Sequence, residues 1–148
     1  HPAAVRRLIA AALVAAAVLG SVGGTAAQAA PPDATAAKAL FDSGKDAFGK
    51  KRYEDAVTLF RKALAESDEL AEAAYWQAQA HEKLAQTKDA LAAYREFLSL
   101  CKARAGDGDK ALAALAQKAE KAVEKLGAAE RELQTLRDAA VEKLLALA

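Results

Sequence analysis

Small and apolar residues recur at helical spacing through most of the chain. Over residues 53–66, Tyr53, Ala56, Phe60 and Ala63 follow one another at intervals of three or four, which places them on one face of a helix. The same spacing predicts helices over four further segments, which are 35–49, 69–84, 88–103 and 109–147. No segment alternates apolar and polar residues as a half-buried strand would. We therefore predict an all-α fold.

The residues between these segments indicate where the helices begin and end. Asp68 and Thr87 precede the third and fourth helices, and their side-chain oxygens are suited to accept hydrogen bonds from free N–H groups there. Lys50, Lys51 and Arg52 follow Gly49 between the first and second helices. This basic run is short and acidic residues follow it, so it predicts a solvated turn rather than a binding patch.

The second pair of predicted helices repeats the first at a distance of 34 residues. A shift of 34 places Ala56 on Ala90 and Phe60 on Tyr94, so a small residue and an aromatic ring recur. Small residues let two helices approach closely, and rings fill the space between one hairpin and the next. A repeat of this length is typical of helix–turn–helix arrays, whose units bury their apolar faces by stacking.

On these residues the chain resembles the tetratricopeptide-repeat (TPR) family, with repeats over 37–70 and 71–104. The resemblance implies an α-solenoid of two helical hairpins, followed by a capping helix and a heptad-patterned C-terminal helix over 105–148. The residues that it assigns to repeat packing are Gly44, Tyr53, Ala56, Phe60, Ala63, Ala78, Ala90 and Tyr94.

The resemblance also implies a binding surface, because the first helix of each TPR lines a concave groove. In this sequence the groove would contain Lys38, Phe41, Lys45, Phe48, Glu72, Tyr75, Trp76, Gln79 and Glu82. Rings beside charges of both signs suit an extended peptide or a partner helix. Trp76 is either the anchor for such a partner or a core residue.

Leucines and alanines recur every seven residues after the Gly-Asp-Gly-Asp sequence at 106–109. The register runs through Gly127, which predicts one long helix; a hairpin that breaks at Gly127 is the alternative. The first half would cap the second repeat. The leucines of this stripe are candidates for self-association unless the helix folds back over the hairpins: Leu126, Leu133, Leu136, Leu144 and Leu147.

Residues 1–29 have the pattern of a secretory signal peptide. Arg6 and Arg7 precede an apolar run over 8–19, and Ala-Gln-Ala at 27–29 fits a signal-peptidase site. The pattern predicts export to the periplasm or the exterior of a bacterial cell, with residues 30–36 as a linker. A retained apolar segment that anchors the protein in the inner membrane is the less favoured alternative.

Charged and reactive residues form no pattern that is typical of an enzyme, a metal or a cofactor site. The chain has 21 basic and 20 acidic residues, a balance that argues against nucleic-acid binding. Cys101 is the single cysteine, so it is either a small half-buried residue or the site of an intermolecular disulfide. We interpret His81 as structural, and Asp42 and Asp46 as a solvated face rather than a cation site.

Two functions fit these observations. The first is a non-enzymatic protein–protein interaction module of the bacterial cell envelope or exterior, which binds a partner peptide or helix in the groove. The alternative is a self-assembling subunit that forms homo-oligomers or extracellular filaments through its N-terminal apolar segment or its C-terminal arm. Contact with a membrane is expected only if residues 1–29 are retained.

Overall fold

A computed structural model of the chain describes residues 34–104 and 108–148, and the elements within these ranges are all α-helices. In chain order they are α2 (Ala34–Gly49), α3 (Tyr53–Glu66), α4 (Glu72–Lys83), α5 (Thr87–Ala103) and α6 (Lys110–Ala146). The predicted all-α class is therefore confirmed. The predicted signal peptide, its membrane-anchor alternative and the first part of the linker lie outside the described residues.

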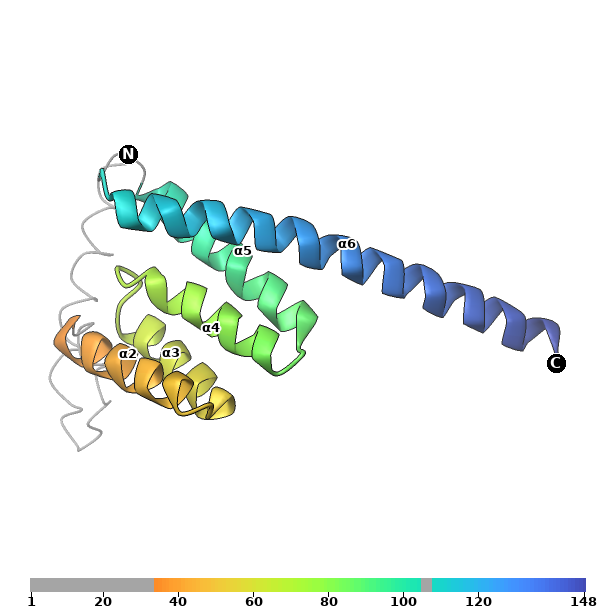
Figure 1. Ribbon diagram of the computed structural model, residues 1–148, viewed down its shortest axis with the longest axis horizontal. Helices are drawn as coiled ribbons and strands as arrows, with labels where there is room; N and C mark the ends of the chain where they lie inside the picture. The colour runs from red at the N-terminus through yellow and green to blue at the C-terminus, as the bar shows by residue number, and fades with distance from the viewer. Residues whose placement is uncertain (1–33, 105–107) are drawn as a thin grey trace, which may run out of the picture. The chain divides into compact units, whose positions relative to one another are not determined.

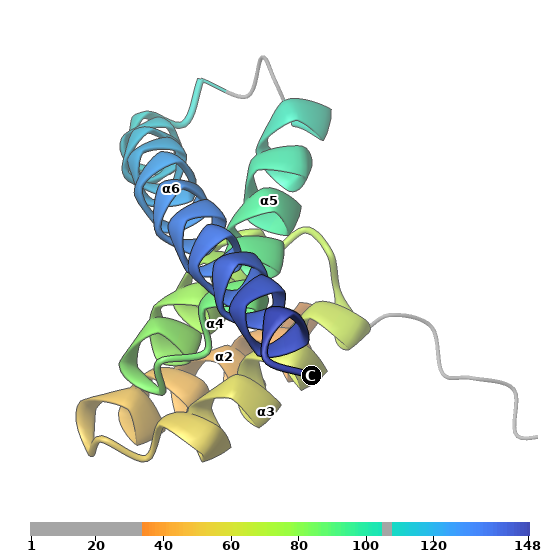
Figure 2. The ribbon, with the colours of Figure 1, turned by 90° about the vertical axis from the view of Figure 1, so that its right-hand side faces the viewer.

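Each helix packs against the next one along the chain (Figure 1). Helices α2 and α3 form one hairpin, α4 and α5 form a second, and α3 packs against α4 where the hairpins meet. Helix α6 then lies along α5, as the view from the C-terminal end of α6 also shows (Figure 2). None of the helices in the described ranges is long and apolar enough to cross a membrane.

The first hairpin is held together around the ring of Phe60. Phe60 is fully buried and contacts Phe41 of α2, with ring centroids 5.8 Å apart. Gly44 of α2 lies directly over the ring, where a Cβ atom would be 2.6 Å from Cε1 of Phe60. The absence of a side chain at Gly44 therefore lets the backbone of α2 approach the ring. Buried alanines of α3 and α4 complete this core: Ala56, Ala63, Ala73 and Ala80.

The second core joins α4, α5 and the first half of α6. Tyr94 and Phe97 of α5 are fully buried there, and Leu112 and Ala119 of α6 cover them. Burial of such side chains stabilises the fold by about 2 kcal/mol each, before entropy is counted. The predicted packing residues that are buried are Gly44, Ala56, Phe60, Ala63, Ala78, Ala90 and Tyr94, while Tyr53 is half-buried.

Two of the predicted helix caps are wrong. Asp68 does not cap the third helix, since α4 begins only at Glu72 and has no side-chain cap. Thr87 does not precede the fourth helix but is its first residue, and no side chain caps α5 either. Asp109, in contrast, caps α6 by accepting a hydrogen bond of 3.1 Å from the Leu112 N–H.

Helix α6 runs without a break through Gly127, so the predicted single helix is confirmed and the hairpin alternative is wrong. Its residues from Leu112 to Leu126 pack against the second core. From Arg131 onward every residue of α6 is exposed, and this half extends past the hairpins (Figure 1). The alternative in which the whole apolar stripe folds back over the hairpins is therefore wrong for the distal half.

Candidate functional site

The predicted groove residues lie on α2 and α4, whose neighbouring surfaces we call the α2/α4 face. It comprises Lys38, Phe41, Lys45, Phe48, Glu72, Tyr75, Trp76, Gln79 and Glu82. The two helices meet through Phe48 and Trp76, whose ring centroids are 5.4 Å apart in an edge-to-face arrangement. Edge-to-face contacts of this kind are favourable because the positive edge of one ring meets the negative face of the other.

Two of these predicted groove residues are in fact core residues. Phe41 is 7% exposed and packs on Phe60, while Tyr75 is 8% exposed and packs on Phe97 with ring centroids 5.5 Å apart. Neither ring is open to a partner. The prediction that Phe41 and Tyr75 line a groove is therefore corrected, because their rings are used to join the helices.

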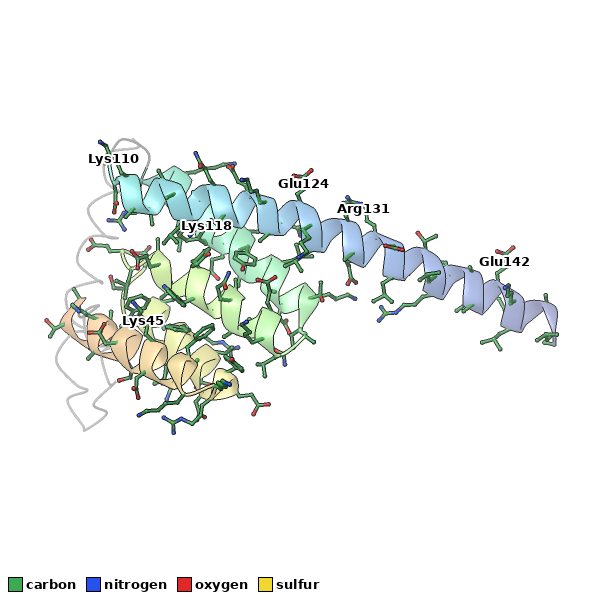
Figure 3. All side chains as sticks on the ribbon, viewed as in Figure 1. Lys45, Lys110, Lys118, Glu124, Arg131 and Glu142 are labelled. Atoms are coloured by element: carbon green, nitrogen blue, oxygen red, sulfur yellow. The ribbon has the colours of Figure 1, made fainter. Side chains whose placement is uncertain are left out.

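Trp76 lies between the two cores and is half-buried, with part of its ring at the surface. Its ring makes edge-to-face contacts with the rings of Phe48 and Tyr75. Nζ of Lys45 lies over the Trp76 ring, 5.2 Å from its centroid, and 5.6 Å from the ring centroid of Phe41. Figure 3 labels Lys45 on α2. A cation at this distance from an aromatic face is attracted by the ring quadrupole. Trp76 therefore serves as a core residue that also presents a surface.

A polar network ties the C-terminal half of α4 to α5. The Tyr94 hydroxyl donates a hydrogen bond of 2.6 Å to Oε2 of Glu82 and accepts one of 2.5 Å from Nε2 of Gln79. Burial raises the pKa of Tyr94 well above its usual range, and the hydrogen bond to Glu82 raises it further. Gln79 and Glu82 are thus committed to a contact within the chain. The residues of the α2/α4 face best placed to meet a partner are Lys45, Phe48, Glu72 and Trp76.

The role of the Tyr94 hydroxyl was missed by sequence reasoning, which assigned Tyr94 to packing alone. Gln79 lies four residues before the end of α4, and Tyr94 lies seven residues after the start of α5. Antiparallel helices that a short turn joins lie side by side, which brings residues of α4 and α5 into contact.

The acidic residues of α2 pair with lysines on the same helix or at its end. Oδ2 of Asp42 lies 2.9 Å from Nζ of Lys38, and Oδ2 of Asp46 lies 2.7 Å from Nζ of Lys50. Their predicted interpretation as a solvated charged face agrees with this arrangement. Within the described ranges, no group of three or more His, Cys, Asp or Glu residues is placed to hold a metal ion.

His81 and Cys101, whose side-chain types often take part in catalysis, have restricted access to solvent. His81 is buried, and its Nδ1 lies 2.7 Å from Oε1 of Gln86 in the turn after α4. Cys101 is half-buried and lines a hollow of about 490 Å³ between α5 and α6, together with Leu98 and Leu112. Burial raises the pKa of the Cys101 thiol, which favours the protonated, less nucleophilic form.

The distal half of α6 is the second surface with an interaction character. Leu136, Leu144 and Leu147 are 62%, 67% and 84% exposed, and Leu133 is also exposed. Leu126, predicted to belong with them, packs instead against the second core. The predicted candidates for self-association therefore reduce to Leu133, Leu136, Leu144 and Leu147. Large apolar side chains gathered on one exposed stripe are typical of an association surface.

Comparison with known proteins leaves the family open. No protein-family model, no curated protein and no solved structure matches the chain. The fold is a helical, repeat-like arrangement by its own geometry, and the resemblance to the TPR family stays a prediction that rests on the repeated residues of the sequence.

Proposed function

We propose that the protein is a non-enzymatic protein–protein interaction module of the bacterial cell envelope or exterior, which binds a peptide or helix of a partner protein on the α2/α4 face. The observation that carries this proposal is the half-exposed ring of Trp76 with Lys45 over it. Tryptophan residues that are held rigidly by their neighbours are frequent anchors of protein interfaces.

The chemistry of this surface specifies the kind of partner. Trp76 and Phe48 offer apolar surface area to a partner. The ring of Phe48 packs edge to face on the ring of Tyr53, with centroids 5.2 Å apart. The Lys45 ammonium is exposed and can turn toward a carboxylate while its stem covers the rings. An apolar side chain followed by an acidic one would therefore be complementary to this surface. Such a motif can be presented by an extended peptide or by one turn of a helix.

The side chains that catalysis would need support a binding role instead. His81 is engaged by Gln86, and Cys101 is half-buried, which raises the pKa of its thiol. Asp42 and Asp46 are paired with lysines. An active site needs a nucleophile, an acid or a base that is held near an accessible pocket. These residues do not form such a group.

A peptide library displayed on phage, selected against the purified protein, tests the proposal. We expect selection of peptides with an apolar residue beside an acidic one, and loss of their binding in the variant Lys45→Glu. The variant Trp76→Phe should weaken binding about tenfold, because a smaller ring keeps the core filled but offers less contact area. Lys62→Glu changes an exposed lysine on α3 in the same way and should leave binding intact. Binding that is insensitive to Lys45→Glu would contradict the proposal.

A second candidate function is self-assembly, and the exposed leucines of distal α6 favour it. A monomer that left this stripe in water would expose an unusual apolar surface. We propose that copies of the chain associate through this segment, either as a small homo-oligomer or as part of a filament. The N-terminal apolar run, the other predicted contact, lies outside the described residues.

A further inference from the structure

We propose that residues 129–147 of α6 pair with the same residues of a second copy in an antiparallel two-helix interface. The inference rests on self-assembly, the second candidate function above, and it specifies the partner, the orientation and the register. Its support comes from the apolar stripe, from the position of α5 and from the charges beside the stripe.

The stripe has the spacing of a helix–helix seam. Leu133, Leu136, Ala140, Leu144 and Leu147 follow one another at intervals of three or four residues, so they lie on one face of α6. Glu124, Arg131 and Glu142 point away from the side on which α5 lies (Figure 3), while Val141 and Leu145 are exposed outside the seam. The seam therefore continues the face of α6 that α5 covers in the first half of the helix. In the second half, this face is exposed.

A second copy of the chain is the occupant that matches this seam. An occupant must be a helix of about the same length with an apolar stripe of its own. The apolar faces of α2, α3, α4 and α5 are used in the two cores. Within the described ranges, the large hydrophobic residues that are exposed all lie in the distal part of α6, from Leu133 to Leu147. The distal α6 segment of a second copy is therefore the helix that matches this seam best.

The position of α5 decides the orientation. Lys88 at the start of α5 lies 3.6 Å from Glu130, which marks where α5 leaves the seam face of α6. In a parallel pair, the first half of the α6 helix of the second copy would run along this face in the space that α5 fills. In an antiparallel pair, the second copy approaches from the free C-terminal end, and its last turn stops beside Ala129. The antiparallel pair is therefore the one that the intramolecular packing permits.

The seam residues then set the register. Antiparallel pairing about Asp138 places Leu136 opposite Ala140 of the second copy, and Leu133 opposite Lys143 of the second copy, whose aliphatic stem can cover the leucine. Ala129 lies opposite Leu147 of the second copy in the same register. The Leu136/Ala140 and Ala129/Leu147 layers are apolar, and each of them matches a large residue with a small one. Such matching fills space without steric overlap.

The charges beside the seam agree with this register. Lys143 and Glu132 lie on the same edge of the seam, and antiparallel pairing brings each close to the other residue of the second copy, so that two attractive pairs form by symmetry. Arg137 lies on the other edge, close to the Arg137 of the second copy, which is one repulsive pair. A parallel pair in register would instead place Lys143 opposite itself. The arginine contact also predicts that Arg137→Gln tightens association several-fold.

Sedimentation and pulsed electron paramagnetic resonance of the full chain test the inference. A nitroxide on Ala148→Cys, in a Cys101→Ser background, should give a distance of about 30 Å in the dimer, since the two labels lie about twenty residues apart along the axis at ~1.5 Å per residue. A parallel pair would give about 10 Å, the separation of two packed helices, and would overturn the inference.

Matched variants separate failure of the inference from failure of self-assembly. The double variant Leu136→Asp/Leu144→Asp should sediment as a monomer with unchanged thermal unfolding of the hairpins, whereas Thr135→Asp on the opposite face should still dimerise. A dimer that survives the double variant would overturn the inference but keep self-assembly. A wild-type chain that is monomeric at all concentrations would overturn both.

Discussion

Gly44 and Phe60 approach each other so closely that a Cβ atom on Gly44 would lie 2.6 Å from Cε1 of the Phe60 ring. The substitution Gly44→Ala would gain about 1 kcal/mol of helix propensity. The methyl group must displace a fully buried ring, however, and such overpacking costs about 1–3 kcal/mol. We expect a net loss of about 1 kcal/mol in the free energy of unfolding, measured by urea denaturation.

Two variants control this prediction. A Cβ atom on Gly49, at the end of α2, would have no neighbouring atom within 4 Å, so Gly49→Ala should be neutral or slightly stabilising. Phe60→Leu combined with Gly44→Ala should lose less than the sum of the two single changes, because the smaller side chain vacates the space. A Gly44→Ala protein that is more stable than the wild type would contradict the close approach.

The buried hydroxyl of Tyr94 predicts a fall in stability at alkaline pH. Its pKa is raised in the folded state, so the unfolded chain releases the proton at a lower pH than the folded chain does. The free energy of unfolding should therefore be unaffected by this group below pH ~10, and above it should fall by up to about 1.4 kcal/mol per pH unit. Urea midpoints measured across this range would show the slope. Tyr94→Phe should reduce it, and an unchanged slope in Tyr94→Phe would contradict the prediction.

The continuity of α6 predicts that Gly127→Ala stabilises the protein. Gly127 lies in the helix, and a Cβ there would meet its nearest neighbour, Nη1 of Arg131, at an ordinary 3.5 Å. The expected gain is about 1 kcal/mol in thermal or urea unfolding. Gly108, with a φ of +66°, should respond in the opposite way and lose about 1 kcal/mol on change to Ala. Destabilisation by Gly127→Ala would indicate a helix end at this glycine.

The half-buried thiol of Cys101 should react slowly. Burial is the main cause that raises its pKa, and the nearby Asp109 raises it too, while Arg104 has the opposite effect. Because only the thiolate attacks alkylating reagents, iodoacetamide labelling should proceed more slowly than for a free cysteine at neutral pH. The difference should disappear in urea. Labelling as fast in the native protein as in urea would show that the thiol is not protected as described.

Local sequence patterns predicted the helices well. The α3 helix is observed at the predicted residues 53–66, since polar turns flank its apolar spacing on both sides. Local rules failed at the start of α4, where Asp68 was the expected cap. There Leu70 and Ala71 accept short-range hydrogen bonds from Ala73 and Ala74, and Ala71 is almost fully buried. The packing of Ala71 decides where this helix begins, and a cap preference of about 1 kcal/mol does not override it.

The candidate surfaces were less predictable because they depend on what covers them. Helical spacing identified the apolar faces that contain Phe41, Tyr75 and Leu126, but spacing does not tell whether a neighbouring helix lies over a face. The structure places all three in or against the cores. Leu136 and Leu144 belong to the same continuous pattern as Leu126, and they are exposed because α5 begins beside Glu130 and does not extend along the residues after it.

The central claim is that distal α6 is an association surface, and hydrogen–deuterium exchange at several protein concentrations tests it most directly. No other helix of the described residues covers residues 131–147, so their amides should exchange rapidly in a dilute sample. We predict that protection of this segment rises with concentration while that of residues 112–126, already packed on α5, stays constant. Protection of residues 131–147 that stays low and independent of concentration would contradict the claim.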